Sequence, residues 1–214
     1  MKAFLGMGLL GSNFVKAMLR KGEQVQVWNR TASKAEALQA DGAKPFTDAA
    51  DAVKGADIIH LTLKDDATVD EVLANAAPGM KPGAMIIDHT TTSAKGAIER
   101  TKTWKEKGLS YLHAPVFMGP QNALEGSGFM LVSGNRDVIK KSTEELSKMT
   151  GKLLNLGGQE GKAASMKLTG NLFLLTLTAG LADTLAFAKA SGVSAADILT
   201  CSVPGIPVPL PPHD

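Results

Sequence analysis

The stretch that decides the fold is Gly6-Met7-Gly8-Leu9-Leu10-Gly11. It directly follows the apolar run Ala3-Phe4-Leu5 and opens a segment with helical periodicity. A Gly-x-Gly-x-x-Gly turn between a strand and a helix is typical of dinucleotide-binding domains: the glycines permit a tight turn, approach of the backbone to the pyrophosphate, and close helix packing. Free amides at the helix N-terminus attract phosphate. We therefore expect the six residues to contact a dinucleotide, and the alternative is a purely structural glycine turn.

Short apolar runs alternate with amphipathic segments along the first three quarters of the chain. The runs are read as buried strands at 3–5, 25–28, 58–61, 84–87, 111–112 and 129–132. The segments between them are read as helices near 12–21, 33–41, 67–75, 93–107 and 135–149. Alternation of this kind builds a doubly wound sheet. The sequence therefore predicts an α/β fold of the Rossmann type, with a mostly parallel sheet.

The second predicted strand ends in Trp28-Asn29-Arg30-Thr31, and this turn bears on the choice of cofactor. A protein that binds NAD usually has Asp or Glu here for the ribose hydroxyls. Asn29 has no repelling charge, Arg30 can pair with a 2′-phosphate, and Thr31 can add a hydroxyl donor. The pattern favours NADP(H) over NAD(H). The alternative is a polar turn with a helix capped by Ser33.

The composition excludes several other classes of protein. Hydrophobic residues make up 44% of the 214 residues and the formal net charge is +2, with Lys and Arg dispersed, so no nucleic-acid partner is expected. The four histidines lack metal-ligand spacing and there is one cysteine, so no metal site is expected. Neither a Gly-x-Ser-x-Gly elbow nor the Gly-Lys-Ser/Thr of a P-loop occurs, which removes the hydrolase and ATPase readings.

The location of the protein is expected to be cytoplasmic. Cys201 has no partner for an internal disulfide, as is usual in a reducing compartment. Met1-Lys2 and the apolar residues after it resemble a signal peptide, but glycines interrupt that run and charges return from Lys16. No other stretch reaches about 18 uninterrupted apolar residues, so no membrane partner is expected.

Three further segments strengthen the dinucleotide reading. Asp88-His89-Thr90-Thr91-Thr92-Ser93 follows a predicted strand, and Ala114-Pro115-Val116-Phe117-Met118-Gly119 follows the next one. The third segment runs from Gly161 to Asn171 and opens a long segment rich in Ala, Leu, Met and Thr. With these, the sequence resembles the β-hydroxyacid dehydrogenases from residue 1 to about 200. That group contains 3-hydroxyisobutyrate dehydrogenase, tartronate semialdehyde reductase and glyoxylate/succinic semialdehyde reductase.

The resemblance implies binding roles for the first two of these segments. Thr91 falls where the family's loop touches the nicotinamide side, and Thr90 is expected to contact substrate; the alternative is an N-cap at Thr92 or Ser93. Among cofactor contacts we also expect Leu63 and Lys64. The loop of Phe117, Met118 and Gly119 corresponds to the family's substrate-carboxylate loop. It departs from the usual Ser-Gly-Gly, which indicates a less polar or unusually shaped substrate unless Phe117 and Met118 are simply core residues.

Lys167 and Asn171 correspond to the family's catalytic helix and are expected to bind substrate. They are four residues apart, so they project from one helix face. Partial burial and the nearby helix N-terminus would both lower the pKa of Lys167 and suit it to acid/base catalysis, whereas the alternative is a solvated helix face. The implied reaction is hydride transfer between the nicotinamide and a small β-hydroxyacid or aldehyde-acid. Lys167 would move the hydroxyl proton and Asn171 would hold the hydroxyl.

The domain organisation follows from these segments. We expect an NADP-binding Rossmann domain over 1–158, the start of an incomplete all-α domain over 159–203, and a proline-rich tail, extended or disordered, over 204–214. One long helix is expected from 161 to 191 and a short one from 194 to 200. The helical part would form a homodimer if it folds. Two alternatives stay open: an NADP-binding fragment with little catalysis, and an enzyme related to imine reductases.

Overall fold

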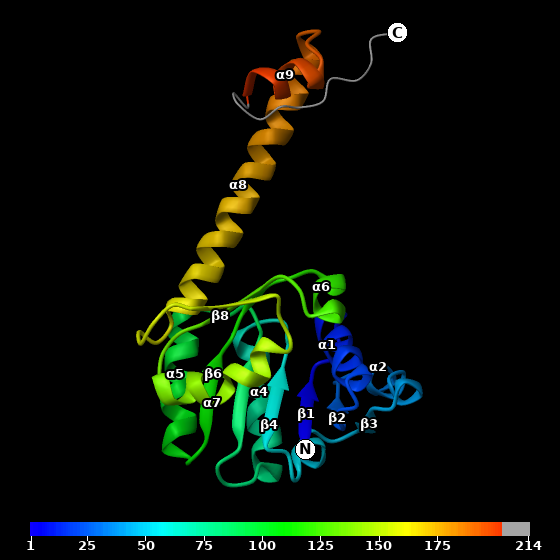
Figure 1. Ribbon diagram of the computed structural model, residues 1–214, viewed down its shortest axis with the longest axis vertical. Coiled ribbons are helices and arrows are strands. Elements are labelled where there is room, and N and C mark those ends of the chain that lie inside the picture. Colours follow the sequence, from blue (N-terminus) through cyan, green and yellow to red (C-terminus); the bar gives the residue numbers. More distant parts are fainter. Residues whose placement is uncertain (203–214) are drawn as a thin grey trace. The chain divides into compact units, whose positions relative to one another are not determined.

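Six parallel strands form the main sheet of the computed structural model, which describes residues 1–202. Their order is β3-β2-β1-β4-β5-β6 (Figure 1). This confirms the doubly wound Rossmann-type sheet. The order reverses between β1 and β4, the position where such sheets bind ligands. The strands are β1 (Lys2–Leu5), β2 (Val25–Trp28), β3 (Lys44–Phe46), β4 (Ile58–Leu61), β5 (Met85–Asp88) and β6 (Ser110–His113).

The helices that connect the strands begin at polar caps in most cases. Side chains of Asp48, Asp65, Ser93 and Asn135 accept hydrogen bonds from the first amides of their helices. The first helix differs, because Gly8 stands at its N-cap position. The helices of this part are α1 (Leu9–Arg20), α2 (Ala32–Glu36), α3 (Ala49–Val53), α4 (Asp66–Ala76), α5 (Ala94–Glu106), α6 (Pro120–Glu125) and α7 (Arg136–Ser147).

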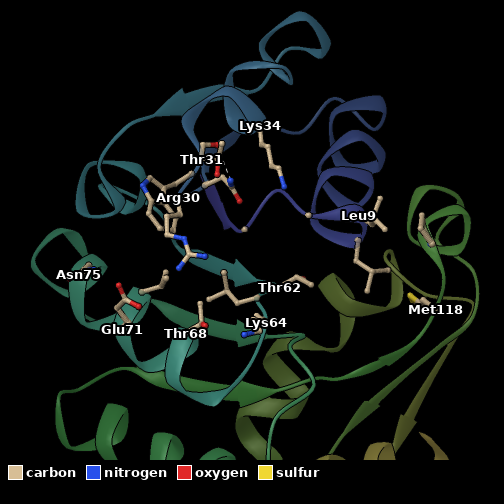
Figure 2. Close-up of a pocket in the computed structure, with 18 residues that line it drawn as sticks. Leu9, Arg30, Thr31, Lys34, Thr62, Lys64, Thr68, Glu71, Asn75 and Met118 are labelled. Atoms are coloured by element: carbon tan, nitrogen blue, oxygen red, sulfur yellow. Dashed lines mark hydrogen bonds between the residues drawn. The ribbon is translucent and has the colours of Figure 1, made fainter. Parts of the chain in front are cut away.

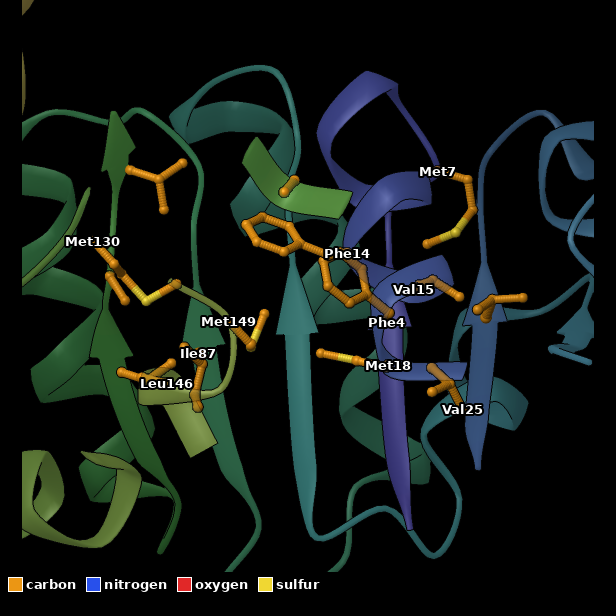
Figure 3. Packing of buried hydrophobic residues seen from close by; sticks show 14 of the residues in the cluster. Phe4, Met7, Phe14, Val15, Met18, Val25, Ile87, Met130, Leu146 and Met149 are labelled. Carbon is orange, nitrogen blue, oxygen red and sulfur yellow. The ribbon is translucent and has the colours of Figure 1, made fainter. Parts of the chain in front are cut away.

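Alternate residues of each main-sheet strand feed two separate cores. On one face, Phe4 belongs to the same cluster as Phe14 and Met18 of α1 and Leu146 of α7 (Figure 3). On the other face, Leu5 packs in a cluster supplied by α3, α4 and α5. The period of two is what a strand buried on both sides requires. Helices therefore cover both faces and leave the ends of the strands to form sites.

A second sheet of three strands departs from the prediction. The run 129–132 was expected in the doubly wound sheet, but it forms β8 (Phe129–Val132) of a separate sheet between β7 (Val116–Phe117) and β9 (Lys152–Asn155). The chain leaves the main sheet at Pro115, which has no amide to donate to a ladder. The carbonyl of Pro115 instead accepts from Leu131 N at 2.9 Å, and β7 pairs antiparallel with β8.

A long helix follows, as predicted. α8 (Lys162–Ala190) and α9 (Ala195–Ser202) account for the helices expected at 161–191 and 194–200. Compactness divides the chain into two units, the first ending at Leu168 and the second beginning at Thr169. The boundary predicted after residue 158 precedes α8 and stays a prediction. The tail at 204–214 lies outside the described residues.

The part of α8 in the second unit presents apolar side chains to solvent. Phe173 and Leu175 are 65% and 70% exposed, and several other leucines are similar. By length and composition alone α8 also satisfies the criteria for a membrane-spanning helix, which a single helix meets in many soluble proteins. An apolar helix surface of this size is normally covered.

Candidate functional site

A cavity of about 720 Å³ opens at the carboxyl ends of β1, β2 and β4, beside the point where the strand order reverses (Figure 2). The glycine turn, the 29–31 turn and the segment after β4 all reach it. The predicted residues that line it are Gly6, Gly8, Leu9, Leu10, Asn29, Arg30, Thr31, Leu63, Lys64 and Met118. The structure thus brings most of the predicted cofactor residues to one place.

The three glycines of the turn have different structural reasons. Gly6 has φ +102°, and a Cβ there would lie 2.3 Å from the carbonyl oxygen of Thr62. A Cβ on Gly11 would lie 1.9 Å from the carbonyl oxygen of Gly6. A Cβ on Gly8 would meet no described atom within 4 Å. Gly6 and Gly11 are therefore required by packing, whereas Gly8 leaves its space free on the cavity side.

The N-terminus of α1 has hydrogen-bonding capacity to spare. Within residues 1–202 no side chain caps α1, in contrast to α3, α4, α5 and α7. The buried hydroxyl of Thr62, which also lines the cavity, has no partner in the described part of the chain. Free amides with the positive end of a helix dipole bind phosphate. Open space at Gly8 and these unpaired donors fit the pyrophosphate of a dinucleotide.

Asn29 joins the two turns that face the cavity. Its Oδ1 accepts from Met7 N at 2.9 Å, and its Nδ2 donates to the carbonyl of Thr31 at 2.9 Å. Met7 itself is buried and does not line the cavity. The side chain of Met7 therefore has a core position and its amide is held by Asn29, and the contact of Met7 with cofactor stays a prediction.

The 30–34 segment supplies positive charge to the cavity. The guanidinium of Arg30 extends toward α4 in Figure 2, and no carboxylate among residues 1–202 forms an ion pair with it. Thr31, not Ser33, is the N-cap residue of α2, and its side chain makes no cap hydrogen bond there. The capping alternative for Ser33 is thus not what the structure shows. Lys34 adds a second basic side chain that the sequence analysis missed.

Half of the eight missed lining residues, Glu71 among them, lie on one face of α4. Because Thr68, Val72 and Asn75 are spaced by four and three, they share one side of the helix. Helical periodicity could have grouped them, but it does not say which cavity they face. The remaining missed residues are Trp28, Lys34, Thr62 and Pro120.

The segment after β5 supports the cavity wall from behind. Thr90 is buried and its Oγ1 accepts from Leu63 N at 2.9 Å, so this hydroxyl is engaged within the protein. Thr91 is exposed. Neither Thr90 nor Thr91 lines the cavity. Of the two residues proposed as a helix cap, Thr92 and Ser93, it is Ser93 that forms the N-cap of α5.

The 117–119 loop is partly occupied by its own contacts. Met118 lines the cavity, but Gly119 N donates to Oδ1 of Asn122 at 2.9 Å. The ring of Phe117 lies outside the cavity lining and contacts Lys167, whose Nζ is 4.1 Å from the ring centroid. The amide of Gly119 is therefore already engaged within the loop.

Lys167 lies near the end of the first unit and Asn171 in the second, both on α8. Burial lowers the pKa of Lys167, as predicted. The helix N-terminus is not among the causes, because Lys167 lies beyond the first turn of α8, where the dipole field has fallen off. Neither Lys167 nor Asn171 lines the cavity.

Two histidines that look unrelated in the sequence meet in the core. Nδ1 of His60 lies 3.0 Å from Nε2 of His89, and Nδ1 of His89 lies 2.9 Å from the carbonyl oxygen of Ala114. Burial lowers the pKa of His89 to about 3. On the other side, Nε2 of His60 lies 3.4 Å from Glu145, whose pKa this contact and Lys2 hold near 2 against the opposing effect of burial. Within residues 1–202 no group of three ligands suits a metal ion.

Comparison with known proteins agrees with this geometry. The family described as the NAD binding domain of 6-phosphogluconate dehydrogenase matches residues 2–158. The human cytokine-like nuclear factor N-PAC is 32% identical over 199 residues, and the match covers 92% of this chain but 36% of that protein. The chain thus spans about a third of the length of this curated relative.

Solved structures agree with this family match. A 3-hydroxyisobutyrate dehydrogenase from Mycobacterium tuberculosis, solved with L-serine, has a TM-score of 0.87 at 25% identity and shares 96% of this chain and 71% of its own. An imine reductase from Myxococcus stipitatus, solved with NADP⁺, has a TM-score of 0.85 at 26% identity and shares 92% and 68%. By its sequence and its fold, this chain belongs to the family of the NAD-binding domain of 6-phosphogluconate dehydrogenase.

Proposed function

We propose that this protein is an oxidoreductase that binds NADP(H) in the cavity and transfers a hydride to or from a small substrate. The observation that carries the proposal is the free space at Gly8 beside the uncapped N-terminus of α1. A turn with free space at this glycine can accept a pyrophosphate, whereas a turn whose glycine is packed against other atoms would exclude it. The likeness to the reductase and dehydrogenase structures supports the same class of reaction.

The predicted cofactor residues have separate roles in this proposal. Gly8, Leu9 and Leu10 hold the pyrophosphate through their backbone, while Gly6 and Gly11 shape the turn. Arg30, with Thr31, binds the 2′-phosphate of NADP. Leu63 and Lys64, on the cavity wall, contact the rest of the dinucleotide, and Thr91, outside the cavity lining, approaches its nicotinamide side.

The acid/base chemistry falls to Lys167. The bound nicotinamide supplies or accepts the hydride. A half-buried amine with a lowered pKa exchanges a proton with a substrate hydroxyl more readily than an exposed one does. Asn171, one helical turn further along α8, orients the hydroxyl. These roles follow the family resemblance and the spacing of the two residues.

The substrate in this proposal is a small β-hydroxyacid or aldehyde-acid of the 3-hydroxyisobutyrate, glyoxylate or semialdehyde type. Its carboxylate would replace Oδ1 of Asn122 as the acceptor from Gly119 N, with Thr90, Phe117 and Met118 around it. The solved imine reductase supports a second candidate, a cyclic imine. Phe117 in place of a hydroxyl side chain favours a substrate with less polar surface on that side.

Replacement of Arg30 tests the preference for NADP. We expect Arg30→Ala to weaken NADPH binding by roughly 10- to 100-fold, because a charge-assisted hydrogen bond contributes about 1.5–3 kcal/mol. NADH binding should stay within about threefold, since NADH has no 2′-phosphate. Fluorescence titration of both cofactors measures this, and Arg136→Ala, outside the cavity, is the matched control. Equal losses for both cofactors would contradict the preference.

Replacement of Lys167 tests the reaction itself. With NADPH bound, we expect the NADPH to be oxidised when glyoxylate or succinic semialdehyde is added. Lys167→Ala should slow this oxidation by roughly 100-fold or more because the proton donor is lost. Lys162→Ala, on the same helix, is the control. Turnover of a cyclic imine alone would favour the second candidate. Tight NADPH binding without turnover of any of these substrates would leave a nucleotide-binding fragment.

We also propose that the protein is a cytoplasmic homodimer joined through α8. The exposed apolar side chains of the second unit, including Leu172, Phe173 and Phe187, provide a surface that a second copy can cover. Sedimentation equilibrium should show a dimer that dissociates when Phe173 and Leu177 are changed to Asp. A monomer at every concentration tested would contradict this arrangement.

A further inference from the structure

The ammonium group of Lys167 lies against an aromatic ring instead of a carboxylate. Its Nζ is 4.1 Å from the centroid of Phe117. Burial lowers the pKa of Lys167, and no carboxylate among residues 1–202 forms an ion pair with its ammonium group. A partly desolvated cation without an anionic partner gains its stabilisation from whatever negative potential is closest. Here that potential is the face of the Phe117 ring.

The ring of Phe117 is held more firmly than the lysine. Phe117 pairs with Phe129 in the antiparallel ladder of β7 and β8. The backbone of Gly128 packs so closely that a Cβ there would lie 2.9 Å from the carbonyl oxygen of Phe117. A lysine side chain has four rotatable bonds, whereas this aromatic side chain starts from a fixed strand. The ring is therefore the fixed partner and the ammonium group the mobile one.

We propose that Phe117 is a positioning residue for Lys167 and that its ring face holds the ammonium group in place of an acidic partner. Attraction between a cation and a ring is weaker than a buried ion pair but grows as water is excluded. A carboxylate would keep the lysine protonated, whereas a ring fixes the place of Nζ and still lets the proton leave. The contact between the ring and the ammonium group does not depend on the proposed function. The transfer of the Lys167 proton to a substrate does rest on the proposed function.

The ionisation of Lys167 can be measured without any turnover. Trace acetylation of the full chain between pH 7 and pH 11, followed by peptide mass mapping, gives the midpoint at which each lysine becomes reactive. Replacing Phe117 with 3,4,5-trifluorophenylalanine keeps the shape of the side chain but removes the negative face of the ring. We expect this change to move the midpoint of Lys167 to lower pH by about one pH unit, a roughly tenfold gain in amine at a given pH below the midpoint.

Two controls separate this effect from a general change. Lys162 lies on the same helix and should keep its midpoint in every variant. Lys44 is exposed and its Nζ lies 5.2 Å from the centroid of the Phe46 ring, so Phe46→Leu should leave the midpoint of Lys44 unchanged. Phe117→Trp should hold Lys167 at least as well as the natural residue, because indole is the strongest of the aromatic partners.

The outcomes are distinct. An unchanged midpoint in the trifluorinated protein would overturn the proposal. A faster limiting rate at high pH with an unchanged midpoint would also overturn it, because the ring would then only shield the amine from reagent. If the midpoint moves while the protein neither binds nor oxidises NADPH, the positioning role stands and the proposed function fails.

Discussion

Gly11→Ala is expected to destabilise the first unit by about 3 kcal/mol or more, because the new Cβ would lie 1.9 Å from a backbone oxygen that cannot rotate away. The carbonyl of Gly6 belongs to the turn itself, so relief would require α1 to move off β1. Urea unfolding followed by circular dichroism measures the loss, and NADPH binding should disappear with the fold.

Gly8→Ala is the matched control for this prediction, since the same methyl group is added three residues earlier in the turn, where no described atom lies within 4 Å. We expect a change in unfolding free energy below about 1 kcal/mol. NADPH binding should nevertheless weaken by roughly tenfold or more, because the methyl group occupies the path of the pyrophosphate. A Gly8→Ala protein that binds NADPH normally would show that the cavity is not the cofactor site.

Acid is expected to destabilise the protein well above the range in which carboxylates titrate. The pKa of His89 is about 3 in the folded protein against 6.5 for a free histidine, so the unfolded chain takes up the proton first as pH falls. The contribution of His89 to the free energy of unfolding is complete above pH 6.5 and is lost as the pH falls from there toward 3. Between pH 7 and pH 5 this amounts to about 2 kcal/mol for one such histidine.

Burial also lowers the pKa of His113, which adds to the loss in the same direction. Glu145 acts later, because its folded pKa near 2 makes its contribution fall only below about pH 4.5. Unfolding free energies measured at pH 7, 6 and 5 therefore report the histidines. His89→Asn keeps a donor for the carbonyl of Ala114 and removes the titration of His89, so the unfolding free energy should fall less steeply between pH 7 and pH 5 than in the parent. The same slope in both proteins would contradict the assignment.

Much of the main sheet could be predicted because its strands are continuous apolar runs, buried on both faces. β3 was missed since Lys44-Pro45-Phe46 is short and contains a proline, which only an edge strand tolerates. β7 was missed because a strand of two residues carries no periodicity. The run that forms β8 was found, but an apolar pattern does not say which strands it will pair with.

The candidate site shows the same limit. The glycine turn and the 29–31 turn are local motifs, so the sequence alone indicates them and their ligand. The contact between Phe117 and Lys167 joins two segments far apart in the chain, and so does that between His60 and His89. No local pattern encodes such pairs, because the position of β7 decides the first contact and the order of β4 and β5 in the sheet decides the second. To predict that residues of α4 line the cavity, both the helical face that they share and the order of the strands in the sheet must be known.

Asn29 has a consequence for how the cofactor preference of such a domain can change. Its Oδ1 holds the amide of Met7, and an aspartate at this position would keep an oxygen in the same place. Only the hydrogen bond from Nδ2 to Thr31 would be lost, in exchange for the carboxylate that recognises ribose hydroxyls. Under the proposed preference for NADP(H), a single Asn29→Asp substitution therefore adds a group that recognises ribose hydroxyls while the glycine turn keeps its shape, so a first step toward NAD(H) does not require the domain to unfold.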